Sequence, residues 1–172
     1  GSAEMKTKTL IFVTLSLVLL FGSIDLSAQK KQLKGKVCGD PTVACKSAGD
    51  FQPFDLAFNT GKSFAIFESE KFYGIVLRSV KLSDWGNCEA PSFAESERLP
   101  IQELFPHNKV FAQNCVETGT NYYSGVANQT AFIGVYAGRT LAEANLFLKT
   151  VKATGKFPGV KVRQMSIGIN GT

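Results

Sequence analysis

The chain has 172 residues, of which 44% are hydrophobic and 19% are charged, with 16 glycines and 6 prolines. A chain of this length and composition is neither disordered nor fibrous, and it is too short for a multi-domain enzyme or a multi-span membrane protein. Its net charge of +5 at pH 7 favours anionic partners such as a membrane surface, a nucleic acid or an acidic cell-wall polymer, although the basic residues form no continuous run.

The N-terminus has the residue order of a secretory signal peptide. Residues 1–4 resemble an expression scar in front of Met5, and two lysines then precede the apolar stretch Leu10–Phe21 and a group of small residues. The apolar stretch is shorter than the roughly 20 residues that a membrane span needs, so a signal peptide over residues 5–28 is favoured over a membrane anchor. We therefore expect an exported protein, periplasmic or extracellular, whose mature chain begins at Gln29 and has no stable membrane span.

Residues 29–62 are expected to form an N-terminal extension to the domain that follows. A basic arm enters a stretch in which glycines and prolines alternate with single hydrophobic residues, and this pattern is typical of a loop. Three phenylalanines of the extension are expected to pack against the core: Phe51, Phe54 and Phe58. The domain itself takes residues 63–172.

The four cysteines all follow the expected cleavage point, and an even number in an exported chain indicates disulfides. Three pairings are possible. We favour Cys38 with Cys45, which closes a short loop, and Cys88 with Cys115, which ties a long loop to a strand. A metal site is not expected, because the chain has no Cys-x-x-Cys pair and its only histidine is His107.

No group of residues in the sequence indicates catalysis. A Ser/His/Asp or Cys/His arrangement would have to use His107, which lies in a predicted turn, and disulfides explain the cysteines. The carboxylates Glu68 and Glu70 flank a turn, and Glu95 and Glu97 lie in a predicted loop, so both pairs are interpreted as solvated. We therefore expect no catalytic residue, no cofactor and no enzymatic activity.

Runs of β-branched and aromatic residues predict the strands of the domain, at residues 63–67, 72–82, 109–115, 130–137 and 160–169. The first two are expected to pair with each other, and residues 119–128 are interpreted as a loop or a sheet edge. Helices are predicted at residues 99–105 and 141–154. The second helix begins with a capping box from Thr140 to Glu143 and ends before Gly155.

An internal repeat organises these elements. Residues 105–110 and 157–162 share the pattern Phe-Pro-x-x-Lys-Val, and each copy ends a predicted helix and opens a predicted strand. Because each helix also follows a strand, the unit strand, helix, strand occurs twice. Two such units predict an α+β, ferredoxin-like βαββαβ domain with a four-stranded antiparallel sheet and two helices on one face.

The second unit has a strand that ends in glycine, a helix opened by an alanine-rich sequence, and a glycine before the last strand: Val135, Gly138, Ala142, Ala144, Leu148 and Gly155. Mainly over residues 130–167, it resembles the SPOR (sporulation-related repeat) domain of bacterial cell-envelope proteins. The resemblance implies binding to peptidoglycan glycan strands that lack stem peptides, on the sheet face away from the helices. The chain departs from the family in its disulfide-stapled extension and its short, proline-bearing first helix.

The side chains of a strand alternate between the two faces of a sheet, so the sequence also predicts which residues stand on each face. Expected toward the helices are Ile75, Leu77, Val110, Ala112, Ile133, Val135, Val160 and Val162. Expected on the open face, as the ligand-binding residues, are Arg78, Phe111, Gln113, Tyr136 and Arg163. This second set combines aromatic rings with hydrogen-bonding groups, which suits sugars. Alternatively, the N-terminal extension covers it.

Two hypotheses follow for the function. The first is an exported cell-envelope module that binds peptidoglycan glycan through the open sheet face. The second is a structural or interaction protein of the envelope that uses the same fold to bind another protein. Nucleic-acid binding through aromatic residues on a similar sheet is not expected, because export and disulfides argue against it.

Overall fold

A computed structural model describes residues 37–38, 44–45, 49–51, 55–60, 66–83, 88–116 and 121–170. All of them belong to one compact unit, residues 33–172. The predicted scar and signal peptide lie outside the described residues, as does Phe54. No helix in the described part of the chain is long and apolar enough to cross a bilayer.

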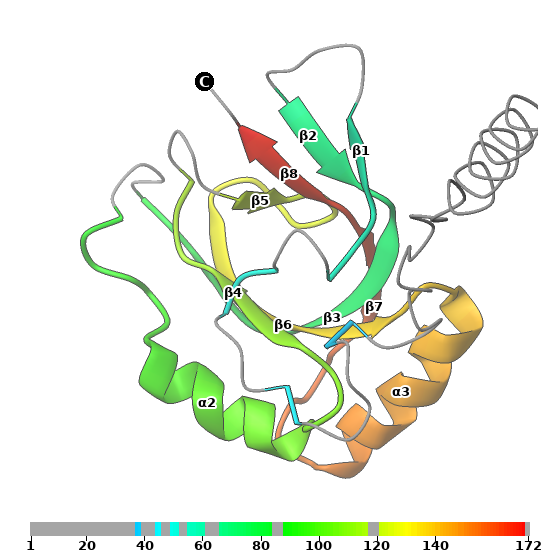
Figure 1. The fold of residues 1–172 in the computed structure, drawn as a ribbon. Helices are drawn as coiled ribbons and strands as arrows, with labels where there is room; N and C mark the ends of the chain where they lie inside the picture. The colour runs from blue at the N-terminus through cyan, green and yellow to red at the C-terminus, as the bar shows by residue number, and fades with distance from the viewer. Residues whose placement is uncertain are drawn as a thin grey trace, which may run out of the picture. The chain divides into compact units, whose positions relative to one another are not determined.

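The described residues form an α+β fold with two helices and two antiparallel sheets (Figure 1). The main sheet has the strand order β4-β6-β3-β7, from β4 (Val110–Gln113), β6 (Thr130–Gly138), β3 (Phe72–Lys81) and β7 (Val162–Met165). The second sheet has the order β1-β2-β8-β5, from β1 (Phe58–Thr60), β2 (Ile66–Ser69), β8 (Ile167–Asn170) and β5 (Asn121–Tyr123). The helices are α2 (Glu95–Leu104) and α3 (Leu141–Ala153).

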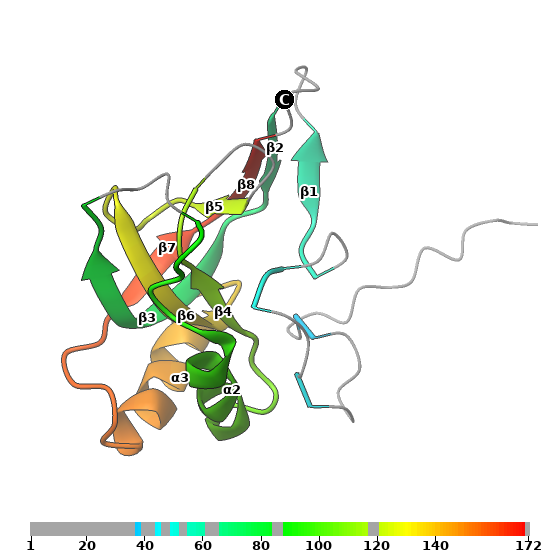
Figure 2. The same cartoon turned by 90° about the vertical axis from the view of Figure 1, so that its left-hand side faces the viewer.

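Both helices cover the same face of the main sheet, as Figure 2 shows. The core between sheet and helices contains every residue that the alternation places there. Six are buried and two are partly buried: Ile75, Leu77, Val110, Ile133, Val135 and Val160, then Ala112 and Val162. This part of the face prediction is confirmed.

The sequence places the start of one helix correctly and that of the other too late. At α3 the predicted capping box is present, since Thr140 Oγ1 accepts from the Glu143 N–H at 3.2 Å and Glu143 Oε2 accepts from the Thr140 N–H at 3.1 Å. Helix α2 begins at Glu95 instead of residue 99, with Pro100 inside it. Its first three residues, 95–97, are polar and exposed, so a search for apolar periodicity overlooks them.

The second sheet was not predicted. The expected final strand divides at Ser166, where β7 ends in the main sheet and β8 enters the second. Ser166 is held at the junction, because Glu68 Oε1 accepts from its hydroxyl at 2.6 Å and Ser124 Oγ accepts from its N–H at 2.8 Å. Strand β2 consequently pairs with β8 and β1, and its expected pairing with β3 is wrong.

The two copies of the repeat meet inside the core. Phe105 and Phe157, the first residues of the two copies, are 3% and 5% exposed, and their ring centroids lie 6.2 Å apart. The two units therefore share one core under the sheet.

Both favoured disulfides are present. Cys38 is bonded to Cys45 across a sequence separation of 7, and Cys88 to Cys115 across a separation of 27. The second joins the chain just before α2 to the end of β4, so it closes the connection between β3 and β4.

The two disulfides are expected to differ in their effect on stability. In the chain-entropy description, replacing Cys88 and Cys115 together by alanine lowers the free energy of unfolding by about 3.5 kcal/mol, and replacing Cys38 and Cys45 lowers it by about 2.5 kcal/mol. The difference arises because the disulfide that closes the longer loop removes more conformational entropy from the unfolded chain. Urea unfolding of the two double variants measures both values. A larger loss for the shorter loop would show that native contacts, and not loop length, set the order.

Candidate binding site

The face of the main sheet opposite the helices forms a second core, not an open surface. Phe111, Tyr136 and Gln113 are 0%, 2% and 5% exposed. Phe51 and Leu56, from the chain before β1, are buried in the same cluster, with the Phe51 ring centroid 5.0 Å from that of Phe111 and 6.4 Å from that of Tyr136. The expectation that these three predicted residues face solvent is wrong. Phe51 and Leu56 share the buried cluster with Phe111 and Tyr136.

Gln113 has a structural part in this second core. Its Oε1 accepts from the Tyr123 N–H at 2.8 Å, and its Nε2 lies 3.5 Å from the Thr130 carbonyl oxygen. The side chain therefore links β4 to β5 and to the start of β6. A buried amide that is already hydrogen-bonded on both sides has little capacity left for a ligand.

Arg78 lies on the helix side of the sheet, not on the predicted face. A β-bulge between Val76 and Arg78 inserts Leu77 as an extra residue, so that Arg78 comes opposite Ile133, which faces the helices. From this side Arg78 Nη1 reaches Glu97 Oε2 of α2 at 3.4 Å. One extra residue is enough to reverse the alternation beyond it.

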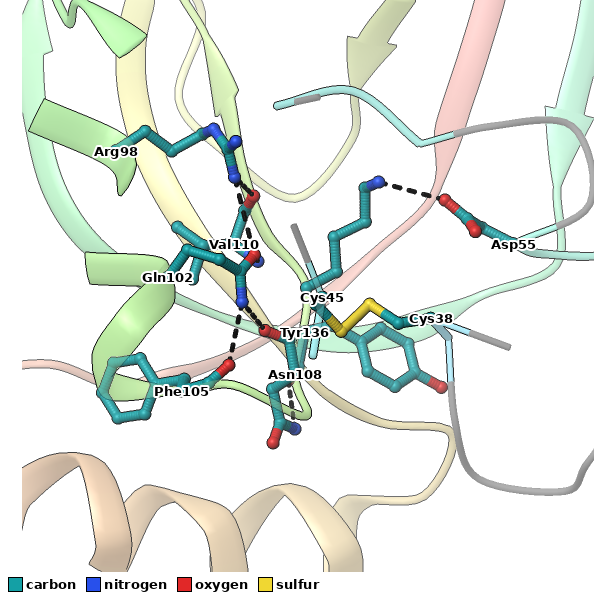
Figure 3. Close-up of a disulfide and its surroundings, with 10 residues drawn as sticks. Cys38, Cys45, Asp55, Arg98, Gln102, Phe105, Asn108, Val110 and Tyr136 are labelled. Atoms are coloured by element: carbon teal, nitrogen blue, oxygen red, sulfur yellow. Dashed lines mark hydrogen bonds and ion pairs between the residues drawn. A yellow bond between two sulfur atoms is a disulfide. The ribbon is translucent and has the colours of Figure 1, made fainter. Parts of the chain in front are cut away.

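Two buried cations that the sequence did not single out have structural partners. Lys109 is 0% exposed, and its Nζ lies 3.1 Å from Asp55 Oδ2 and 5.5 Å from the ring centroid of Phe51. Burial lowers the pKa of Lys109, and the Asp55 carboxylate opposes that shift. Figure 3 shows Asp55 in this contact.

The second buried cation, Arg98, belongs to a hydrogen-bond network between α2 and β4 (Figure 3). Its Nη1 donates to the Val110 carbonyl oxygen at 2.9 Å, while Gln102 Oε1 accepts from the Val110 N–H at 2.9 Å. Gln102 Nε2 donates to the carbonyl oxygens of Phe105 and Asn108, both at 2.9 Å. The network satisfies the outward N–H and C=O of Val110 in β4. Hydrogen bonds from Arg98 also lower the pKa of Glu95.

The two remaining predicted residues, Arg78 and Arg163, line one groove. We call it the cationic groove; its volume is about 370 Å³, and it is bounded by residues 76–79 of β3, by residues 158–161 and by Arg163 of β7. Lys161 adds a third positive charge, and all three basic residues are exposed. The site residues predicted from the sequence did not include Lys161. Its position in the second copy of the repeat, where it corresponds to Lys109, was the signal that could have identified it.

A second cavity, of about 540 Å³, lies between Cys45 and α2 and has a mainly apolar lining: Ala44, Cys45, Leu99, Gln102, Glu103 and Pro106. Among the described residues, no three His, Cys, Asp or Glu side chains are grouped so that they would hold a metal ion.

Comparisons of the chain with protein-family models, with curated proteins and with solved structures find no match. The cationic groove has a more highly charged lining than the apolar cavity beside Cys45. The described residues that line the groove supply three cations, one hydroxyl from Ser79 and backbone groups, without a carboxylate, a histidine or a cysteine. Such a lining binds carboxylate or phosphate groups and offers no nucleophile paired with a base.

Proposed function

We propose that the protein is an exported, non-enzymatic interaction protein of the bacterial cell envelope, and that it binds an anionic partner in the cationic groove. One observation carries this proposal. The sheet face that would take a glycan is packed under Phe51 and Leu56 of the same chain, whereas the groove with Arg78, Lys161 and Arg163 is exposed. The buried face thus favours the interaction protein over the sheet-face glycan binder.

The fold is compatible with a relation to SPOR domains. The order β4-β6-β3-β7, with antiparallel pairing and both helices on one face, supports a ferredoxin-like βαββαβ topology. The second sheet and the covered face are departures from the arrangement that the resemblance implies. Peptidoglycan glycan is the second candidate ligand, because glycan strands without stem peptides carry free carboxylates that suit the positive charge of the groove.

Two disulfides are compatible with export to an oxidising compartment. Together with the signal-like order of the N-terminal residues, they support a periplasmic or extracellular location. The net charge of +5 favours an acidic partner there.

Site-specific photo-cross-linking tests the proposal in cells that make the protein. A benzophenone amino acid in place of Ser79, which lines the groove, is expected to give discrete adducts that a protease digests and lysozyme does not. The same group in place of Leu146, which is 69% exposed on α3, is the matched control and is expected to give none.

Sedimentation with purified sacculi, with and without amidase treatment, tests the second candidate. The interaction protein is expected to stay in the supernatant in both cases. Co-sedimentation with amidase-treated sacculi, together with the absence of protein adducts at Ser79, would overturn the proposal in favour of glycan binding.

A further inference from the structure

The contact between Lys109 and Asp55 holds an amine and a carboxyl group together inside the molecule (Figure 3). Lys109 Nζ lies 3.1 Å from Asp55 Oδ2, and the two side chains are 1% and 6% exposed. Lys109 directly precedes β4, whereas Asp55 lies in the chain before β1. The fold, and not closeness in the sequence, therefore brings together two groups that can react to form an amide.

Aromatic rings lie beside this contact. The centroid of the Phe51 ring is 5.5 Å from Lys109 Nζ, and Phe51 in turn packs against Phe72 and Phe111, with ring centroids 5.4 Å and 5.0 Å away. All three phenylalanines are buried. A site with little water favours an amide over a separate amine and carboxylic acid, because water is released when the amide forms and is needed to break it.

Desolvation favours the uncharged forms of two groups at this site. Burial lowers the pKa of Lys109, although the charge and the hydrogen bond of Asp55 oppose that shift. Partial burial raises the pKa of Asp50, although the positive charges of Lys109 and Arg98 oppose the change. An uncharged amine is a nucleophile, and a protonated carboxyl group can supply a proton. Lys109 thus has one carboxyl group within reach of its nitrogen, and the charge of a second one, Asp50, acts on it.

We propose that the folded protein joins Lys109 to Asp55 by an intramolecular amide bond. The ammonium group of Lys109 first gives a proton to the Asp55 carboxylate, and the neutral Nζ then attacks Cγ. A C–N bond forms and one C–O bond breaks. The departing oxygen leaves as water with two protons from the former ammonium group, and Asp50 relays a proton between the nitrogen and this oxygen. The step needs no oxidant, reductant or second substrate, and it happens once in each chain.

The ion pair between the two side chains is the reactant of this step. Opposite charges 3.1 Å apart stabilise each other, so freshly folded protein carries mainly the charged pair and reacts slowly through a minor neutral form. The fixed geometry compensates in part, because oriented groups at about 3 to 3.5 Å react as though one were present at about 10⁵ M or more. The stability and the titration of the ion pair are properties of protein that has not yet reacted, and its mass identifies that form.

The bond gives the extension a covalent attachment that the disulfides do not provide. Cys38–Cys45 joins two residues of the extension to each other, and Cys88–Cys115 joins two residues of the domain. An amide between residues 55 and 109 ties the extension itself to the start of β4. The segment that carries Phe51 then stays attached to the domain even when both disulfides are reduced.

Mass spectrometry of the intact, reduced chain tests the proposal. Protein stored for several days is expected to be lighter, by one water molecule, than the mass calculated from its sequence, and freshly synthesised protein is expected to contain less of this lighter species. Dehydration of an aspartate to a succinimide causes the same change in mass, so the position of the change is measured as well. A stored chain with the full calculated mass would overturn the proposal.

Tryptic digestion of the denatured and reduced chain locates the bond. Trypsin does not cleave after a lysine whose amine is part of an amide, so residues 47–62 are expected to appear joined to residues 99–139. Lys161 is the internal control, because it is exposed and is followed by valine, as Lys109 is. Cleavage after Lys161 and not after Lys109 is the expected pattern.

Matched substitutions identify the reacting groups. Lys109→Arg keeps a positive charge beside Asp55, but a guanidinium group stays protonated and is not a nucleophile, so this variant is expected to lose no water. Lys161→Arg is the matched control and is expected to react as the wild type does. Asp50→Asn keeps the shape of the side chain but removes the proton relay, and is expected to slow the reaction about a hundredfold or more.

Water loss that persists in Lys109→Arg would place the change elsewhere in the chain and overturn the proposal. Complete cleavage after Lys109 in stored wild-type protein would do the same without any variant. If Asp50→Asn reacts as fast as the wild type, the proton relay assigned to Asp50 is wrong. None of these results depends on a ligand in the cationic groove, so the proposed function is tested separately.

Discussion

Replacing Tyr136 by alanine is expected to lower the free energy of unfolding by about 3 to 5 kcal/mol, the loss found when a buried aromatic side chain is removed from a core. Tyr136 is 2% exposed, and its ring contacts those of Phe51 and Phe72, with centroids 6.4 Å and 5.7 Å away. The substitution leaves a cavity between the main sheet and the chain that covers it. Urea unfolding followed by circular dichroism measures the change.

The control is Leu146→Ala on α3, where the side chain is 69% exposed and a change within about 0.5 kcal/mol is expected. If Tyr136→Ala were as mild as this control, Tyr136 would have to be solvated. The sheet face would then be open, and binding of glycan to that face would become the better hypothesis.

Removing one partner of the buried ion pair between Lys109 and Asp55 is expected to have an effect of similar size. Lys109→Ala or Asp55→Ala alone should lower the free energy of unfolding by about 3 to 5 kcal/mol, because the remaining charge loses its compensating partner in the interior. Lys109→Met combined with Asp55→Leu fills the same space without charge and is expected to recover most of that loss. A double variant as unstable as the single ones would show that packing, not charge, accounts for the effect.

Alkaline titration offers an independent check on the same lysine. Burial holds the folded-state pKa of Lys109 below the usual value of 10.5. Between these two pKa values the unfolded chain binds more protons than the folded one, so the contribution of Lys109 to stability rises with pH. Lys109→Met is expected to remove this rise, and an unchanged pH profile in the variant would contradict it.

Several features of the fold follow from the sequence because local rules determine them. The capping box at Thr140 depends on two residues of one turn. The period of two along the strands correctly placed eight apolar residues toward the helices. The disulfide pairing was inferred from sequence spacing, and it is the pairing found.

The opposite face of the sheet shows why the candidate site was harder to predict. Alternation places Phe111 and Tyr136 away from the helices, which is correct, but it carries no information about what lies on that side. Aromatic residues suit a sugar-binding surface and a core equally well. What decides between them is the position of Phe51, a contact between residues far apart in the chain.

Arg78 and the lysines of the two repeat copies, Lys109 and Lys161, show a different limit on predicting side-chain environments from sequence. The bulge that turns Arg78 toward α2 has no reliable residue signature in β3, and it moves the side chain to the other face. Lys109 and Lys161 occupy the same place in the same six-residue pattern, yet one is buried beside Asp55 and the other is exposed. Tertiary partners, not the motif, determine their environments.

The covering of β4 also bears on how the chain behaves at high concentration. The outer edge of β4 has its Val110 groups bonded by Arg98 and Gln102, and its Ala112 N–H bonded by Gly49. Bare sheet edges are templates for aggregation, because they pair with any other exposed strand. A fragment that starts after residue 51 would lose the Gly49 bond and uncover part of this edge. We therefore expect such a fragment to self-associate at high concentration more readily than the full chain.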